Sequence, residues 1–396
     1  MTRGIIIFFI LLCLVSPVWT QERVEIFGYF ESQFMGTRLR NQFYQLYTNK
    51  LRVDLQSRLS ERVTFIANFD DITYHGKTTW NILDFLAPEI TNTVPAELQP
   101  YYVLPFADRH FLDNAFLKLT FEHFDLTLGK QQISLGTGYV WNPVDVFNIK
   151  DILDPTYEQP GHNAVRLDLP LGSSYSLMAL YSPEDQWKNS ARLVRFKGRI
   201  SHFDYALIAI EKQWRFHDYT QIAPSQTGFL ETPEKRQLVG ASTAGELFGL
   251  GIWAEGAYNK MEITDNFYEL VVGIDYTFDF QTYFMCEFYR NTLGKSDSRD
   301  YTINDWMRLM ATEQKAIAHD QLYLFVQHPI TDFVNLGSSF IFSISDGSLA
   351  LVPTLNYSFA QNVDMMAYLN FNCGKSGTAF DKNQGHGGIL RVRVYF

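Results

Sequence analysis

The stretch GKQQISLGTGYVWNPVDVFN, residues 129–148, contains a Gly-Thr-Gly sequence that raises the question of a phosphate-binding loop. Such a loop needs a following helix whose N-terminal amides receive the anion. The segment NPVDVFN has no helical apolar period, and the third glycine of a dinucleotide fingerprint is absent. We therefore interpret the stretch as a sharp bend stiffened by aromatic and proline residues.

Catalytic chemistry is not indicated elsewhere in the chain. A hydrolase needs a nucleophile, a base and an orienting group within hydrogen-bond reach, but the nine histidines are scattered and form no His-x-x-His spacing. One acidic and imidazole cluster offers a divalent-ion site as an alternative to a solvated loop end. Its members are Asp70, Asp71, His75, Asp108, His110 and Asp113. We expect no enzyme activity, no resident metal and no cofactor.

Charged side chains recur at alternate positions within apolar segments. The predicted inward-facing cations are Arg52, Arg58, Lys118, Arg166, Arg195, Lys197, Arg199, Arg391 and Arg393, and the predicted inward-facing acids are Glu255, Glu269, Asp275 and Glu287. Two walls of opposite charge across water would set up a transverse field that selects ions. The alternative for each residue is structural pairing with a neighbouring strand.

The elements that would position these charges are strands. From about residue 23 onward, segments of roughly ten residues alternate apolar and polar side chains, which is the pattern of strands with one apolar face. Their connections alternate between very short and long, with the longer ones including 34–42, 72–109, 136–160, 213–236 and 291–318. Aromatic residues gather at the short turns, as in the interfacial girdle of an outer-membrane barrel. We predict an all-β transmembrane antiparallel β-barrel of about 18 strands, with 16 as the alternative count. The short turns would be periplasmic and the long loops extracellular.

The ends and the composition agree with export. Residues 1–20 read as a secretory signal peptide because their apolar run is too short to span a membrane. The formal net charge of −10 argues against nucleic acid as a partner. We expect Cys286 and Cys373 to be unpaired. The expected partners are outer-membrane lipid and, through the terminal Phe396, the barrel-assembly machinery, in the outer membrane of a Gram-negative-type bacterium.

Part of the chain resembles a known group of proteins. The matching positions are Gly129-Lys130-Gln131, Gly136, Trp141, Asn142-Pro143 and Asn163-Ala164-Val165-Arg166-Leu167. This pattern is similar to substrate-selective outer-membrane porins, including the alginate-export type and related uncharacterised porin families. The resemblance implies a barrel spanning residues 21–396 and leaves the solute unidentified.

A barrel this wide encloses water unless a segment enters it. We expect the 136–160 loop to fold inward as a constriction built on Gly136, Gly138, Trp141, Asn142 and Pro143, with an outward surface loop as the alternative. A short helix is predicted at about 302–318, where Thr302 and Asp305 have capping-box spacing.

The predicted function is passive, selective diffusion of small hydrophilic solutes, anionic ones in particular. The alternatives are a plugged barrel with a structural, adhesive or assembly role, and an outer-membrane hydrolase. A saccharide pore would use exposed aromatic faces, for which the candidates are Tyr29, Tyr139, Trp141, Trp306 and Tyr323. The oligomeric state stays open.

Overall fold

The fold is a closed barrel of 18 antiparallel strands. The computed structural model describes residues 24–39, 42–150, 152, 158–225 and 228–396, so the predicted signal peptide at 1–20 lies outside the described residues. The barrel strands are β1 (Val24–Leu39), β2 (Gln42–Ser60), β3 (Val63–Gly76), β6 (Arg109–Thr120), β7 (Asp125–Gln132), β8 (Gly161–Leu171), β9 (Tyr175–Ser182), β10 (Ala191–Ile200), β11 (Phe203–Ile222), β12 (Phe229–Leu247), β13 (Leu250–Met261), β14 (Phe267–Thr277), β15 (Tyr283–Asn291), β16 (Asp320–Thr331), β17 (Val334–Ser343), β18 (Ser348–Ala360), β19 (Val363–Asn372) and β20 (His386–Tyr395).

The first and last strands close the sheet. β1 pairs with β2 on one side and with β20 on the other, where Tyr29 lies opposite Tyr395 and Arg38 lies opposite His386. Closure leaves no free sheet edge, which is the condition for strands to cross a membrane with every backbone group paired. The predicted barrel class is confirmed, and of the two predicted counts the structure has 18.

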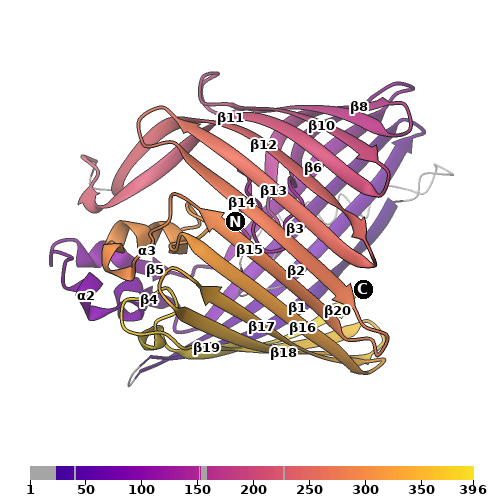
Figure 1. Cartoon of the computed structure of the whole chain (residues 1–396). Helices are drawn as coiled ribbons and strands as arrows, with labels where there is room; N and C mark the ends of the chain where they lie inside the picture. Colours follow the sequence, from indigo (N-terminus) through magenta and orange to yellow (C-terminus); the bar gives the residue numbers. More distant parts are fainter. Residues whose placement is uncertain (1–23, 40–41, 151, 153–157, 226–227) are drawn as a thin grey trace, which may run out of the picture.

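Short and long connections lie at opposite ends of the barrel (Figure 1). At the end that carries the C-terminus, β2 and β3 are joined through residues 61–62 and β12 and β13 through Phe248 and Gly249, both at positive φ as in a tight two-residue turn. Two of the predicted long loops are mostly strand. β1 and β2 pair out to Leu39 and Gln42, and β11 and β12 pair out to Ile222 and Phe229, because ladder bonds continue past the membrane-crossing part of these hairpins.

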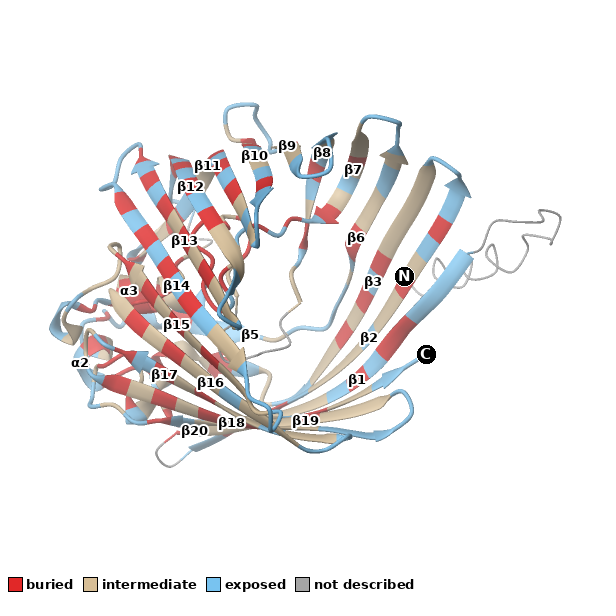
Figure 2. Ribbon diagram, turned by 45° about the vertical axis from the view of Figure 1, so that its right-hand side comes forward, coloured by how far each residue is buried: buried red, intermediate tan, exposed pale blue. Residues whose placement is uncertain are grey.

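The outward face is apolar. Along strands such as β12 and β14, exposed residues alternate with buried ones (Figure 2), and the exposed set of the barrel includes Leu117, Val165, Val194, Leu207, Val239, Val272 and Ile274. At the short-turn end, exposed aromatic side chains form the predicted band and include Phe121, Phe248, Phe278, Phe280, Phe333, Phe359 and Phe396. An apolar belt with an aromatic rim is the outer surface that a lipid bilayer requires.

The opposite end carries a compact cluster of loops. The 77–108 connection contains β4 (Thr79–Asn81), η1 (Ile82–Phe85), α2 (Pro88–Thr91), η2 (Gln99–Tyr102) and β5 (Val103–Pro105), and the 292–319 connection contains η3 (Ser298–Asp300) and α3 (Ile303–Met310). Apolar residues of these loops pack on one another, on Tyr219 at the end of β11, and on Ala379 in the 373–385 connection, which also holds η4 (Lys382–Gln384). No helix in the described part of the chain is long and apolar enough to cross a membrane.

The helix α3 is shorter than the predicted span of 302–318. Thr302 and Asp305 form the predicted capping box at its start. The helix ends at Met310 because Ala311 is its C-cap and Thr312 has a φ of 55°. Cys286 on β15 and Cys373 after β19 are free thiols.

Candidate functional site

Residues 133–150, which follow β7, enter the barrel and pack on its inner wall. We call them the inward segment. Ile133, Leu135, Val144 and Phe147 are buried against inward-facing apolar residues of β8 to β13. Those wall residues are Ala164, Met178, Leu180, Ala191, Leu193, Ala206, Ile208, Ile210, Leu238 and Ala257. The inner wall formed by β8 to β13 is therefore apolar, and the inward segment covers it in place of water.

Glu255 of β13 holds the glycine-containing bend. Its carboxylate accepts backbone N–H groups from Thr137 at 2.6 Å, from Gly138 at 3.2 Å and from Val144 at 2.7 Å. Gly136 has a φ of 84°, and a Cβ at this position would lie 2.4 Å from a Glu255 carboxylate oxygen. The bend therefore requires glycine for its backbone conformation and for its close approach to the carboxylate.

Glu287 of β15 holds the next three residues. Its carboxylate accepts N–H groups from Tyr139 at 2.6 Å, Val140 at 2.9 Å and Trp141 at 2.9 Å, and it also accepts the indole N–H of Trp253 at 2.7 Å. Four donors on one carboxylate satisfy a buried anion. Since β7 and β15 are not neighbours in the barrel, the segment crosses the interior to reach this wall.

The sequence predicted that the acidic residues of β13, β14 and β15 face water in the lumen. The structure differs from this prediction. Glu255, Glu269 and Glu287 point inward, but they are 1%, 3% and 0% exposed. Glu269 is enclosed by Lys315 at 3.2 Å, Arg236 at 3.3 Å and the Tyr289 hydroxyl at 2.6 Å. Asp275 accepts the Tyr283 hydroxyl at 2.9 Å. Glu255 and Glu287 anchor the inward segment through its backbone N–H groups, and Glu269 anchors the 292–319 connection through Lys315.

Bonds within the segment keep its shape. Asn142 donates its side-chain amide to the Leu135 carbonyl at 3.1 Å, and the Pro143 carbonyl accepts the Lys315 ammonium at 3.1 Å. Lys150 donates to the carbonyls of Gly138 and Tyr139 at 2.9 and 2.8 Å. Burial lowers the pKa of Lys150, and the carboxylates of Glu287 and Glu255 oppose that shift.

The predicted basic wall is largely paired. Arg52 contacts Asp54 at 2.8 Å, Arg166 contacts Asp168 at 2.7 Å, and Arg199 contacts Asp204 at 2.6 Å. The remaining paired cations are Lys118 with Asp125 at 3.0 Å, Arg391 with Glu31 at 3.4 Å, and Arg393 with Glu31 at 2.6 Å. The alternative of structural pairing therefore describes most of this wall.

Three cations differ from the rest. Among the described residues, Arg58, Arg195 and Lys197 have no carboxylate partner within ion-pair distance. Arg58 and Lys197 are exposed, and the Arg195 guanidinium has only a 3.5 Å contact to the Ser134 carbonyl. The excess positive charge of β10 therefore lies beside the start of the inward segment.

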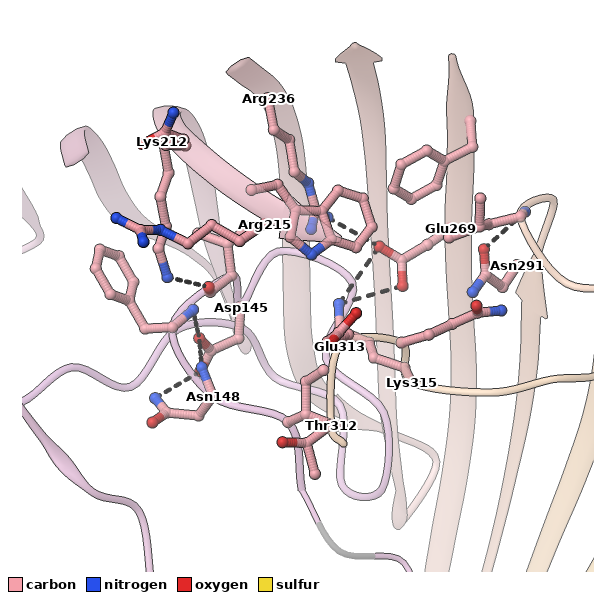
Figure 3. A pocket seen from close by; sticks show the side chains of 18 of the residues that line it. Asp145, Asn148, Lys212, Arg215, Arg236, Glu269, Asn291, Thr312, Glu313 and Lys315 are labelled. Atoms are coloured by element: carbon pink, nitrogen blue, oxygen red, sulfur yellow. Dashed lines mark hydrogen bonds and ion pairs between the residues drawn. The ribbon is translucent and has the colours of Figure 1, made fainter. Parts of the chain in front are cut away.

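Three hollow regions flank the segment. A cavity of about 390 Å³ lies between it, β11, β12 and the 312–315 loop, and Figure 3 shows Lys315 and Arg236 reaching Glu269 on its wall. On the side of β1, β2, β6 and β8 lie cavities of about 460 and 510 Å³, which share Phe27, Arg52, Asp54 and Gln132 in their linings.

The end of the loop returns to the wall on the β1 side. Glu158 accepts the Tyr29 hydroxyl at 2.6 Å and the Lys50 ammonium at 2.7 Å, and it lies near Arg52 and Arg393. Burial disfavours the Glu158 carboxylate, but the Lys50 ammonium and its hydrogen bond outweigh burial and lower the pKa of Glu158. Sequence reasoning missed this residue because nothing in its neighbourhood marks it as an ion-pair partner.

Other candidate residues take structural positions. Trp141 stacks on Tyr289 with ring centroids 5.0 Å apart and packs edge-on against Tyr323, while Trp306 is buried in the loop cluster, so these rings present no free face to a sugar. Asp70 pairs with Lys50 at 3.2 Å, and Asp108 accepts the Tyr74 N–H at 2.8 Å. Within the described ranges, no three His, Cys, Asp or Glu residues are grouped to hold a metal ion.

Comparison with known proteins identifies the fold. No family model matches the sequence, and no curated protein matches it either. Among solved structures, OccAB1 of Acinetobacter baumannii is 10% identical with a TM-score of 0.56, and the match covers 95% of this chain and 96% of that chain. A mutant of the Rh. blastica porin is 14% identical with a TM-score of 0.47, covering 94% and 100%, and the outer-membrane protein OmpT of Vibrio cholerae is 10% identical with a TM-score of 0.47, covering 95% and 99%. With its closed 18-stranded barrel and apolar belt, the protein is an outer-membrane β-barrel.

Proposed function

We propose that the protein is a porin that allows passive, selective diffusion of small hydrophilic solutes across the outer membrane. The observation that carries this proposal is the inward segment, which Glu255 and Glu287 attach to the wall opposite its origin. An 18-stranded barrel is wide enough for an aqueous lumen. A segment fixed across that lumen narrows it without filling it, since cavities flank it.

A preference for anions is part of the proposal. The carboxylates of Glu255, Glu269 and Glu287 are enclosed by loop atoms and by Lys315, so they contribute little field to the remaining passage. Arg195 and Lys197 lack a carboxylate partner within the described residues, so their positive charge is not neutralised and acts on passing ions. Charged side chains at a narrow point set ion selectivity.

The test is the current through the purified protein in a planar bilayer with a potassium chloride gradient. A porin gives stable open steps, and a basic passage displaces the reversal potential toward that of chloride. A reversal potential on the potassium side would contradict the anion preference. A fully inserted barrel that carries no current would contradict diffusion.

One observation favours a second candidate. The apolar cluster of three connections and the end of β11 at the long-loop end resembles the core of a small domain more than it resembles mobile loops. A barrel closed by this cluster would act through its loop surface, as a structural, adhesive or assembly protein. The same bilayer experiment separates the two functions, because a closed barrel is silent.

A further inference from the structure

The end of the inward loop, residues 158–161, lies between two cavities. Pro160 lines the 390 Å³ cavity on the side of β11 and β12, whereas Glu158 and Gln159 line the 510 Å³ cavity on the side of β1 and β2. We call residues 158–161 the return limb. Because residues of the return limb line both cavities, its position affects the width of a passage between them.

A single carboxylate ties the return limb to the barrel wall. Glu158 accepts hydrogen bonds from Tyr29 of β1 at 2.6 Å and from Lys50 and Arg52 of β2 at 2.7 and 3.3 Å. Arg393 of β20 adds an ion pair at 3.6 Å. These donors come from the three strands at which the barrel closes, and charge-assisted bonds of this kind are about twice as strong as neutral ones.

The wall itself does not need Glu158. Lys50 also pairs with Asp70 at 3.2 Å, Arg52 with Asp54 at 2.8 Å, and Arg393 with Glu31 at 2.6 Å. Removing the Glu158 charge therefore leaves none of these cations without a carboxylate, so the large cost of an unpaired buried charge does not arise. Apart from the Tyr29 hydroxyl, which loses its acceptor, the wall keeps its pairing, so the contacts of Glu158 act mainly on the position of the limb.

We propose that Glu158 is a positioning residue that holds the return limb against β1, β2 and β20 and thereby sets the aperture between the two cavities. This inference rests on the proposed diffusion through the lumen. With the Glu158 carboxylate in place, the return limb is fixed to Lys50, Arg52 and Arg393. Without it, the limb leaves this wall and the aperture widens, while Gly161 stays bound to Asp113 at 3.2 Å and keeps the start of β8 in place.

The test compares Glu158→Gln and Glu158→Ala with the wild type, with Glu158→Asp as the conservative variant and Glu184→Gln as the matched control. Glu184 lines the 390 Å³ cavity, but its ion pair, with Arg215 at 3.8 Å, does not involve the return limb. Single-channel conductance and exclusion of neutral polymers of graded size are measured in planar bilayers. Barrel folding is verified by heat-dependent mobility on gels.

We expect Glu158→Gln and Glu158→Ala to raise conductance about twofold or more and to admit larger polymers, as a wider aperture predicts. Glu158→Asp and Glu184→Gln should stay near the wild type.

Three outcomes overturn the inference. A changed reversal potential with an unchanged polymer cut-off would make Glu158 only a charge in the passage. A conducting wild type with identical Glu158 variants would remove the positioning role and leave diffusion intact. Inserted barrels that are silent in the wild type and in every variant would contradict diffusion and positioning together.

Discussion

At the scale of single residues, three inward-facing carboxylates are buried, whereas the sequence predicted that they face water. Glu287 has four N–H donors within 2.9 Å and is fully buried, so it shapes the lumen by holding chain and not by its field. Alternation along β15 was enough to predict that Glu287 points inward. The sequence did not reveal which groups cover Glu287, because every residue type except proline has the same backbone N–H group. The one related signal was the glycine-containing bend, whose position in the barrel the sequence did not give.

Glu287→Gln should release the segment at Tyr139 to Trp141. An amide oxygen has no charge to attract three backbone donors, and hydrogen bonds to a charged group contribute about 1.5–3 kcal/mol each. We expect a noisier open current and a thermal midpoint lower by several degrees, measured in bilayers and by circular dichroism in detergent. Glu246→Gln, at an exposed position near the end of β12, is the control. A quiet current with an unchanged midpoint would show that the anchor is dispensable.

Arg195 and Arg199 lie on the same face of β10 and offer a matched pair for ion selectivity. Arg199 pairs with Asp204 at 2.6 Å, whereas Arg195 has no carboxylate partner among the described residues. Arg195→Gln should therefore reduce the anion preference more than Arg199→Gln does, as measured by reversal potentials in a salt gradient. Equal effects would mean that pairing does not determine which cation acts on the passing ion.

At the scale of elements, the inward segment is also part of an internal core. Deleting residues 136–149 would uncover Leu193, Ile208 and Leu238, which this segment buries. We expect the deletion to raise conductance and to lower the thermal midpoint together, since large apolar surfaces become exposed to water. Shortening the exposed connection 184–189 should change neither property. Higher conductance at unchanged stability would mean that the segment narrows the lumen without supporting the wall.

The sequence predicted the strands and the helix more accurately than the residues at which they begin and end. Period-two alternation identified the strands, and β18 continues through Pro353, with Leu351 opposite Phe371 and Thr354 opposite Tyr368 in one register. The extensions of β11 and β12 past the membrane were missed because polar residues can pair in a ladder as readily as apolar ones. The helix was predicted too long because its end depends on the positive φ of Thr312, which is no glycine.

At the scale of the whole molecule, the alternation of buried and exposed residues predicts which face contacts lipid. Val272 lies near the middle of β14 and is 42% exposed, whereas Tyr276, on the same face, lies near the end of the strand beside Phe278 of the aromatic band. An arginine on the lipid face costs about 2–4 kcal/mol at the bilayer midplane and about 0–1 kcal/mol near the interface. Val272→Arg should therefore lower the free energy of unfolding in liposomes by that larger amount, and Tyr276→Arg should lower it less.

This comparison also bears on the oligomeric state. Folding free energies from denaturant titrations in liposomes report the environment of each side chain in the inserted protein. If Val272→Arg costs no more than Tyr276→Arg, the outer face of β14 is not in an apolar environment, and a polar contact with a second copy of the chain becomes the explanation to test. If the depth dependence holds, the outer face of β14 is in an apolar environment, and any polar contact between copies must use another part of the belt, because an arginine cannot be solvated within apolar surroundings.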